Sequence, residues 1–233
     1  MVLQKNTLFS GTIKENLRNY GDIIFSNTIN DLYEPVNTHP DIQIHFFNNS
    51  EAICCPELYN YYREKLPKSI SLISGNNKAG GGYPNDASYN VAVFGRNLVC
   101  NINYTEKIIL DYYKNLGYNI INVRQGYTKC NICLIDDNAV ITEDDGIYKE
   151  LISNNIDVCK INSGEIGLRN FKYGFIGGAS GYIDKNSIGF LGDIKKHPEF
   201  DKINTFSKKY KKQIISLGNS TVTDYGSIIS FYL

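Results

Sequence analysis

The side chains best suited to chemistry in this sequence are a thiol, imidazoles and carboxylates at the starts of short strand-like runs. Cys130 directly follows Lys129, whose positive charge favours the thiolate. A thiolate is the nucleophile of cysteine-dependent C–N bond hydrolysis, and a histidine moves the protons of such a reaction. Cys130 is therefore the first catalytic candidate, and the alternative is that it is a small buried hydrophobe.

The histidines give the candidate bases. His197 lies between a predicted strand and a predicted helix, a common place for function in α/β folds, and Asp193 is close enough to orient its imidazole. His39, before Pro40, is the second candidate base. The alternative is that His197 and Asp193 cap the following helix and that His39 only shapes a turn.

A set of polar residues recurs just before or within the first strand of each predicted hairpin. If those strands face one axis, the set lines a central pocket, and convergent polar groups are the usual sign of a ligand site. The alternative is that each residue bonds its own turn. The set comprises Asn37, His39, Asp41, Asn85, Asp86, Asn90, Lys129, Cys130, Asn131, Gly177, Gly178, Ser180, Asp224 and Ser227.

Neither a metal nor a cofactor is expected from the motifs. Cys130 and Cys133 have the spacing of a redox or zinc pair, but in a predicted strand their sulfurs face opposite sides. The glycine-rich run 177–181 leads into a strand, whereas a phosphate loop opens a helix.

Composition limits the class of protein. The 233 residues contain 24 Lys and Arg against 24 Asp and Glu, so charge gives no reason to expect nucleic acid as a partner. We find no run of apolar residues long enough for a transmembrane helix and no secretory signal, and six cysteines then suggest free thiols. We expect a cytoplasmic, single-domain protein spanning 1–233 with a small-molecule ligand and no membrane partner; its oligomeric state stays open.

The elements that must position these residues form a repeat. A helix, a tight turn and a short β-branched strand recur along the chain, and most helices follow a predicted hairpin. The predicted helices are Thr12–Tyr20, Glu57–Leu66, Thr105–Leu116, Asp145–Ser153 and Pro198–Tyr210. The predicted hairpins pair Ile42–Phe47 with Ala52–Cys55, Tyr89–Phe94 with Asn97–Cys100, Asn131–Ile135 with Ala139–Thr142, and Tyr173–Ile183 with Ser187–Leu191.

The two ends of the chain complete the count. Ser227–Leu233 reads as a strand with no helix after it, and Val2–Phe9 with the first helix supplies the missing parts. Joining the two ends would close a ring of about five strand–strand–helix–strand units and remove the open edge. An ordinary doubly wound sheet is disfavoured because it has one strand per helix.

Such a ring resembles the pentein fold, the α/β-propeller of guanidino-group-modifying enzymes, over nearly the whole chain. The likeness is greatest to an uncharacterised bacterial family of that fold. The motifs that carry it are Gly126–Cys130, Ile141–Ile147, Gly174–Gly181, Gly192–Pro198 and Asp224–Ile228.

The resemblance implies a nucleophilic cysteine in the last unit and a histidine in the fourth. The matching segments here, 224–230 and 177–180, contain neither. We therefore expect a pocket for a small cationic or amino-acid-like ligand held by Asp41, Asp86 and Asp224. C–N hydrolysis by Cys130 with His197 or His39 is the catalytic version. The rival is a non-catalytic interaction module like the ribosome anti-association factor, which shares the fold.

Overall fold

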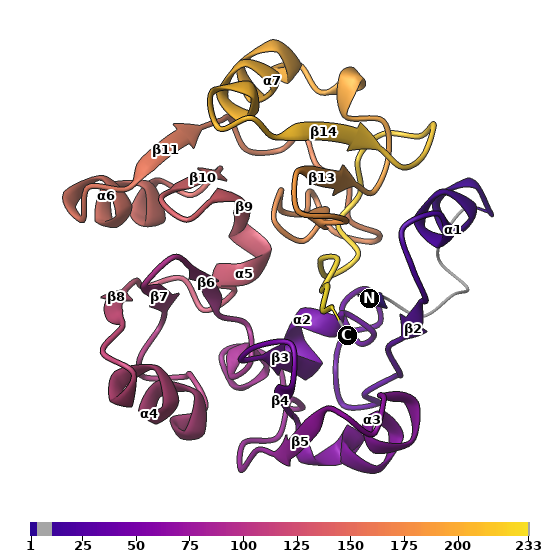
Figure 1. Ribbon diagram of the computed structural model, residues 1–233, viewed down its shortest axis with the longest axis vertical. Coiled ribbons are helices and arrows are strands. Elements are labelled where there is room, and N and C mark those ends of the chain that lie inside the picture. Colours follow the sequence, from indigo (N-terminus) through magenta and orange to yellow (C-terminus); the bar gives the residue numbers. More distant parts are fainter. Residues whose placement is uncertain (4–10, 233) are drawn as a thin grey trace.

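The protein is a mixed α/β chain in which small sheets and their helices surround a central region (Figure 1). The computed structural model describes residues 1–3 and 11–232. The strands are β1 (Val2–Leu3), β2 (Ile24–Phe25), β3 (Ile44–Phe46), β4 (Glu51–Cys54), β5 (Ser71–Ser74), β6 (Ala92–Phe94), β7 (Asn97–Cys100), β8 (Asn119–Asn122), β9 (Ile132–Asp136), β10 (Ala139–Thr142), β11 (Asp157–Lys160), β12 (Ser180–Tyr182), β13 (Ser187–Phe190) and β14 (Gln213–Ser216).

The longer helices lie on the outside of the molecule, and the first strand of each larger sheet lies nearest the centre (Figure 1). The α-helices are α1 (Gly11–Arg18), α2 (Pro40–Gln43), α3 (Tyr59–Lys65), α4 (Lys107–Asn115), α5 (Thr128–Asn131), α6 (Asp145–Ser153) and α7 (Phe200–Lys209). The 3₁₀ turns are η2 (Pro56–Leu58), η3 (Asn85–Ala87) and η4 (Ile194–Lys196).

The sheets share one plan. Four three-stranded sheets have the orders β3-β4-β5, β6-β7-β8, β9-β10-β11 and β12-β13-β14. In each, the first two strands form an antiparallel hairpin and the third pairs parallel to the second after a helix. β1 and β2 form a two-stranded parallel sheet around α1. Within the described residues, the sheets are separate and none closes on itself.

Helix α6 shows why the sequence pattern forms these elements. Ile147 and Leu151, four residues apart, are buried, and they pack with Val140 of the sheet beneath. Asp144 begins the helix by accepting a hydrogen bond from the Ile147 amide at 2.7 Å. Asn155 ends the turn in the left-handed region, with φ of 59°. The predicted bounds Asp145–Ser153 are confirmed.

The starts of the hairpins differ from the prediction. Residues expected at the beginning of two strands end short helices instead: Ile42 and Gln43 belong to α2, and Asn131 belongs to α5. Tyr173–Ile183 is a strand only over β12, and most of the segment is a loop. Pro40 favours the first turn of α2 through its fixed φ, and the Lys129 and Cys130 amides of α5 donate to the side-chain oxygen of Asn90.

The predicted C-terminal strand is also different. Within the described part, Ser227–Tyr232 forms no strand of a sheet, although Ile229 makes a β-bridge and the Ile228 amide donates to the Ser180 carbonyl at 3.0 Å. Its expected partner segment, Val2–Phe9, lies largely outside the described residues. A buried cluster nevertheless joins Ile13 and Leu17 of α1 to Leu217 and Ile228 near the chain end.

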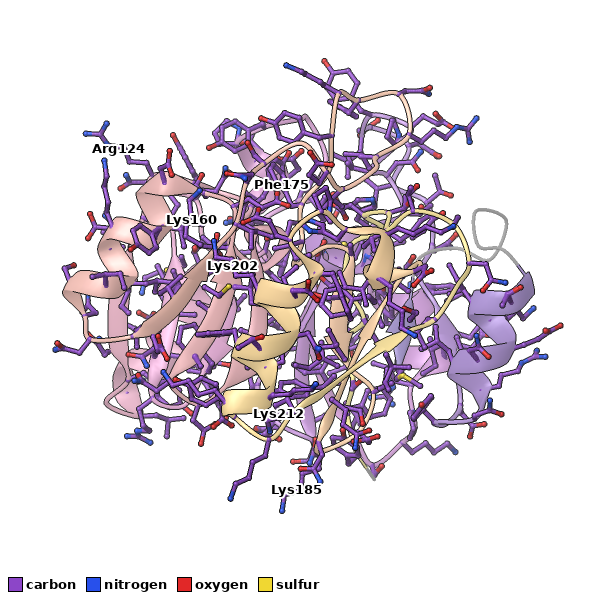
Figure 2. The ribbon with its side chains drawn as sticks, turned by 90° about the horizontal axis from the view of Figure 1, so that it is seen from above. Arg124, Lys160, Phe175, Lys185, Lys202 and Lys212 are labelled. Carbon is purple, nitrogen blue, oxygen red and sulfur yellow. The ribbon has the colours of Figure 1, made fainter. Side chains whose placement is uncertain are left out.

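The molecule has two different ends when it is seen from the side. Lys185, in the turn between β12 and β13, and Lys212, just before β14, lie at one end (Figure 2). Phe175 and Arg124, from loops that link one sheet to the next, lie toward the other end (Figure 2). None of the described helices has the length and apolar character required to span a membrane.

Candidate functional site

Side chains from four of the sheet units meet at the centre of the molecule. The Cys130 thiol of α5 donates to Asp41 Oδ2 of α2 at 3.1 Å, and Asn90 Nδ2 contacts the same sulfur at 3.1 Å. The side-chain oxygen of Asn90 also accepts from the backbone amides of Lys129 and Cys130. The short helices α2 and α5 carry Asp41 and Cys130, whose side chains meet at the centre.

Ser227 connects the last segment of the chain to this cluster. Its hydroxyl donates to Asp41 Oδ2 at 2.6 Å and accepts from Lys129 Nζ at 3.2 Å. Ser227 has a φ of 72°, a left-handed conformation that is unfavourable for a serine. The surrounding structure holds this strained residue in place, since its amide donates to the Gly178 carbonyl at 2.6 Å.

Asp224 and His39 form the second layer of the cluster. The Asp224 carboxylate accepts from the backbone amides of Phe175 at 3.0 Å and Gly226 at 2.9 Å. His39 Nδ1 lies 3.8 Å from Asp224 Oδ1, and both side chains are buried. Burial lowers the pKa of His39 to about 4 and raises the pKa of Asp224 to about 6. His39 is therefore neutral at pH 7.

The electrostatics of Cys130 favour a protonated thiol. Burial raises its pKa well above the usual value, and the carboxylates of Asp41 and Asp224 raise it further. Burial also raises the pKa of Asp41, while the neighbouring His39 opposes that rise. Lys129 was expected to favour the thiolate, but its ammonium instead donates to Ser227. The resting sulfur is a hydrogen-bond donor.

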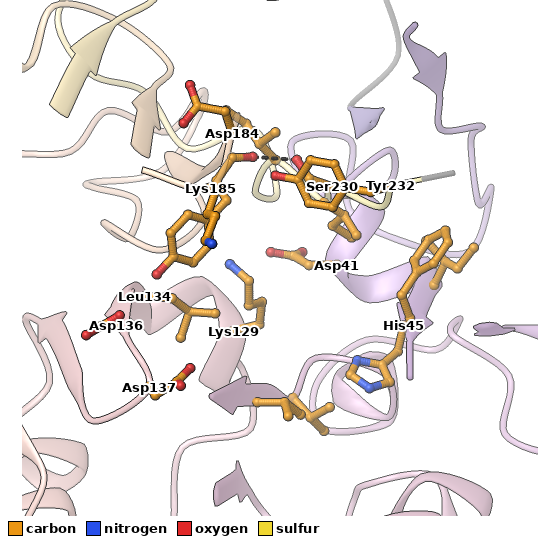
Figure 3. Close-up of a pocket in the computed structure, with 18 of the residues that line it drawn as sticks. Asp41, His45, Lys129, Leu134, Asp136, Asp137, Asp184, Lys185, Ser230 and Tyr232 are labelled. Atoms are coloured by element: carbon orange, nitrogen blue, oxygen red, sulfur yellow. Dashed lines mark hydrogen bonds between the residues drawn. The ribbon is translucent and has the colours of Figure 1, made fainter. Parts of the chain in front are cut away.

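A cavity of about 550 Å³ opens beside this cluster. Figure 3 shows the Lys129 ammonium and the Asp41 carboxylate pointing toward one another inside it. The walls are largely apolar or aromatic, and the rim carries charges of both signs. The lining includes Ile44, His45, Tyr89, Val91, Leu134, Asp136, Asp137, Tyr182, Asp184, Lys185, Lys212, Ile228, Ser230 and Tyr232.

Other predicted ligand residues support the centre without facing the cavity. Asp86 accepts from the Tyr127 hydroxyl at 2.6 Å, and Asn131 Nδ2 donates to the Tyr127 carbonyl at 2.9 Å. Ser180 Oγ donates to the Ile176 carbonyl at 2.8 Å. The bonds of Asn131 and Ser180 fit the alternative that such residues bond their own turn, whereas Asp86 bonds a residue 41 positions away.

Asn37, Asn85 and Gly178 are also outside the cavity lining. Asn37 contributes its carbonyl, which accepts from the Ile29 amide, and Asn85 lines a separate surface cavity. Gly178 packs so closely that a Cβ there would lie 2.1 Å from Asp224 Oδ1. Gly178 therefore allows close approach between the fourth hairpin and Asp224.

Asp193 and His197 act locally. Asp193 accepts from the Lys195 amide at 3.2 Å and from Ser216 Oγ at 2.8 Å, and His197 Nδ1 accepts from the Glu199 amide at 3.1 Å. No hydrogen bond joins Asp193 to His197 within the described residues. Asp193 caps the short turn η4 and not α7, and His197 accepts from the amide of the residue before α7.

Glu143 is a buried acid that the sequence analysis did not select. The residue after it, Asp144, makes the cap of α6. The two carboxyl oxygens of Glu143 are buried without a hydrogen-bond partner. Burial raises its pKa to about 8, and the charge of Asp224 contributes to the rise. Since the sequence shows only a charged residue before a helix, nothing in it signals this burial.

Comparison with protein families decides the family. A model described as "Family of unknown function (DUF6873)" matches residues 6–229. The chain belongs to this family. The match includes all residues of the central cluster, from His39 to Ser227. No curated protein sequence matches the chain significantly.

Solved structures show the fold that the family shares. DDAH from Pseudomonas aeruginosa has a TM-score of 0.56 and 6% identity, over 92% of this chain and 83% of that one. C. jejuni agmatine deiminase has a TM-score of 0.54 and 13% identity, over 93% and 75%. The Microseira wollei amidinotransferase SxtG has a TM-score of 0.51 and 9% identity, over 93% and 78%. A mixed α/β fold similar to these proteins is confirmed, whereas the closed ring of five units stays a prediction; identities this low show the fold alone.

Proposed function

We propose that this chain binds a small amino-acid-like molecule in the central cavity, with Lys129 facing its carboxylate and Asp41 its cationic group. The observation that carries the proposal is the pair of opposite charges directed into one cavity (Figure 3). A volume of about 550 Å³ suits a ligand of this size. The apolar and aromatic walls would cover its methylene groups.

The structural neighbours support this class of ligand. The DDAH structure is a complex with citrulline, and another agmatine deiminase structure holds its substrate. Both ligands belong to the arginine-like class. In this chain the segment that would carry the nucleophile has Ser227 in its place, and Ser227 bridges Lys129 and Asp41. The bridge fixes the two charged groups for binding.

The proposal includes a closed arrangement of five units around the cavity. The backbone supports it, since Gly178 N donates to Cys130 O at 2.8 Å, Ser227 N to Gly178 O at 2.6 Å and Asp41 N to Gly226 O at 3.3 Å. These bonds link α2, α5, the start of the fourth hairpin and the last segment around the centre. Apolar packing of α1 with Leu217 and Ile228 also joins the two ends of the chain.

A thermal-shift measurement tests the ligand. At a concentration 100 times its Kd, arginine stabilises by about 2.7 kcal/mol, which for a chain of this size raises the melting temperature by roughly 5–10 °C. Agmatine, which lacks the carboxylate, and citrulline, which lacks the guanidinium charge, should each give a smaller shift. If none of the three shifts the transition, the ligand proposal fails and an interaction role gains support.

Two variants separate the roles of the charges. Lys129→Met should remove the advantage of arginine over agmatine, because only arginine offers a carboxylate. Asp41→Asn should instead remove the advantage of arginine over citrulline. Lys149→Met changes an exposed lysine of α6 and should leave every shift unchanged. Equal losses for all three ligands in both variants would contradict the assigned orientation.

C–N hydrolysis is the catalytic version of this proposal. The observation that favours it is that Cys130, Asp41 and His39 place potential ligating or proton-transfer atoms within 4.8 Å of one another. Asp41 would accept the thiol proton as the sulfur attacks the guanidinium carbon and would return it to the nitrogen that leaves when the C–N bond breaks; water would then hydrolyse the C–S bond of the intermediate. Release of ammonia or an amine that is lost in Cys130→Ala would support this step; the raised pKa of the thiol favours binding without it.

The rival function is a non-catalytic interaction module. Exposed aromatic side chains favour it: Tyr33, Tyr83 and Phe171 are 71%, 52% and 50% exposed, and each lies in a loop between one sheet and the next. Such side chains are common at protein interfaces. A module of this kind would keep its partner in the Lys129→Met variant, whereas the preference for arginine over agmatine would not survive that change.

A further inference from the structure

We propose that His39, Asp41 and Cys130 form a binding site for a zinc-like divalent metal ion. The three side chains come from two turns far apart in the sequence, and each contributes one ligand atom within 4.8 Å of the others. Imidazole, carboxylate and thiolate are the ligand types that zinc takes in proteins. This inference does not depend on the small-molecule proposal.

Unsatisfied polar atoms provide the second observation. His39 Nε2 and Asp41 Oδ1 are buried and have no hydrogen-bond partner among the described residues. His39 and Asp41 are only 1% and 2% exposed. Buried polar groups without partners are costly, and they are rare in folded proteins. A bound cation would satisfy both groups at once.

The geometry is close to that of a bound ion. With Zn–S of about 2.3 Å and Zn–O of about 2.0 Å, tetrahedral ligands lie about 3.5 Å apart. Cys130 Sγ lies 3.1 Å from Asp41 Oδ2, the other oxygen of the same carboxylate, and all three ligand atoms lie within 4.8 Å of one another, so small side-chain shifts would bring them around one ion. The three protein ligands would leave a fourth position for water or another ligand.

The surrounding residues match the outer shell of a metal site. Asp224 lies beside the His39 ring at 3.8 Å, Ser227 donates to Asp41, and Asn90 contacts the sulfur. Carboxylate neighbours of this kind orient metal-bound histidines, and hydrogen bonds orient metal-bound carboxylates. Asp41 also lines the cavity, which gives an ion a route from solvent.

Charge and protons balance on binding. In the metal-free protein the Cys130 thiol is protonated and donates a hydrogen bond to Asp41. Binding replaces that S–H bond by an S–metal bond and releases the proton to solvent. A dication with one thiolate, one carboxylate and a neutral imidazole has no net charge, which suits a buried site. Affinity should therefore rise with pH.

The sequence argument against a metal concerned Cys130 paired with Cys133. In the structure Cys130 lies in α5 and Cys133 in β9, and Cys130 faces Asp41. Cys133 is a matched control, since it is also buried and only three residues away. Of these two cysteines, only Cys130 belongs to the proposed metal site.

The test titrates the metal-stripped full-length protein with Zn²⁺ by calorimetry and with Co²⁺ by absorption spectroscopy. We expect one Zn²⁺ per chain, proton release, and a thiolate-to-cobalt charge-transfer band. Cys130→Ala should lose the band and weaken Zn²⁺ binding by at least about 100-fold, more than loss of an outer-shell partner does. Cys133→Ala should keep both. Equal binding by the Cys130→Ala protein would overturn the site.

X-ray absorption of zinc in the unchanged protein covers the case in which a variant fails to fold. One sulfur with nitrogen and oxygen ligands supports the site, whereas no sulfur or two sulfurs contradicts it. Zinc and the cationic end of an arginine-like ligand would compete for Asp41. Zinc binding without any arginine effect would therefore retain this site and reject the proposed ligand, and the reverse result would do the opposite.

Discussion

Gly226→Ala is expected to destabilise the protein by about 2–5 kcal/mol, because a left-handed residue with a Cβ costs about 1–2 kcal/mol and a forced contact in packed surroundings adds about 1–3. Gly226 has a φ of 76°, and a Cβ there would lie 2.6 Å from the His39 Cα. The collision is with backbone, so a rotamer change cannot relieve it. The substitution should also weaken the hydrogen bond from the Asp41 amide to the Gly226 carbonyl.

Gly82→Ala is the matched control for this effect. Gly82 has nearly the same φ, 74°, but nothing lies within 4 Å of a Cβ placed on it. It should therefore show the backbone cost alone, about 1–2 kcal/mol. Chemical denaturation of both variants measures the difference. Equal losses of stability would mean that the last segment does not pack against His39 as described.

Glu143→Gln is expected to change the pH dependence of stability most strongly. Burial raises the pKa of Glu143 to about 8, against 4.5 for the free side chain. The folded protein thus keeps a proton that the unfolded chain loses, so the stabilising effect is complete below pH 4.5 and is lost as the pH rises through 8. Glutamine keeps the shape of the protonated acid and cannot ionise.

The wild-type protein should therefore lose roughly 2–4 kcal/mol relative to the Glu143→Gln variant between about pH 5 and pH 9. Denaturant melts at several pH values measure this difference, and their comparison removes the contribution of other groups. Glu150→Gln, an exposed position of α6, serves as control and should follow the wild type. A constant difference between Glu143→Gln and wild type across the pH range would contradict the buried, protonated state.

Much of the fold was predictable because its signals are local. The helix Asp145–Ser153 is marked by the Asp144 cap and by Asn155 after its end, and both lie within a few residues of it. The same holds for Asn97–Cys100 and Ala139–Thr142, each the second strand of its own hairpin, whose predicted bounds agree with the structure. The C-terminal segment was harder, since its partners depend on distant parts of the chain.

The site shows the same division between local and distant information. Repeat position led to Asp41, Cys130 and Ser227, which meet although Asp41 is 89 residues from Cys130 and 186 from Ser227. By contrast, Asp193 and His197 were paired because they are close in sequence, and the structure gives each a separate local partner. The protonation of Cys130 was not predictable, because burial and two carboxylates outweigh the adjacent Lys129.

The separation of the sheets has a consequence for how the native protein opens. Each larger sheet has a middle strand, β4, β7, β10 or β13, that is hydrogen-bonded on both sides. Because no shared ladder couples one sheet to the next in the described chain, each unit is able to fluctuate on its own. Amide deuteration should consequently be slowest in the four middle strands, with a separate protection free energy for each of the four larger sheets.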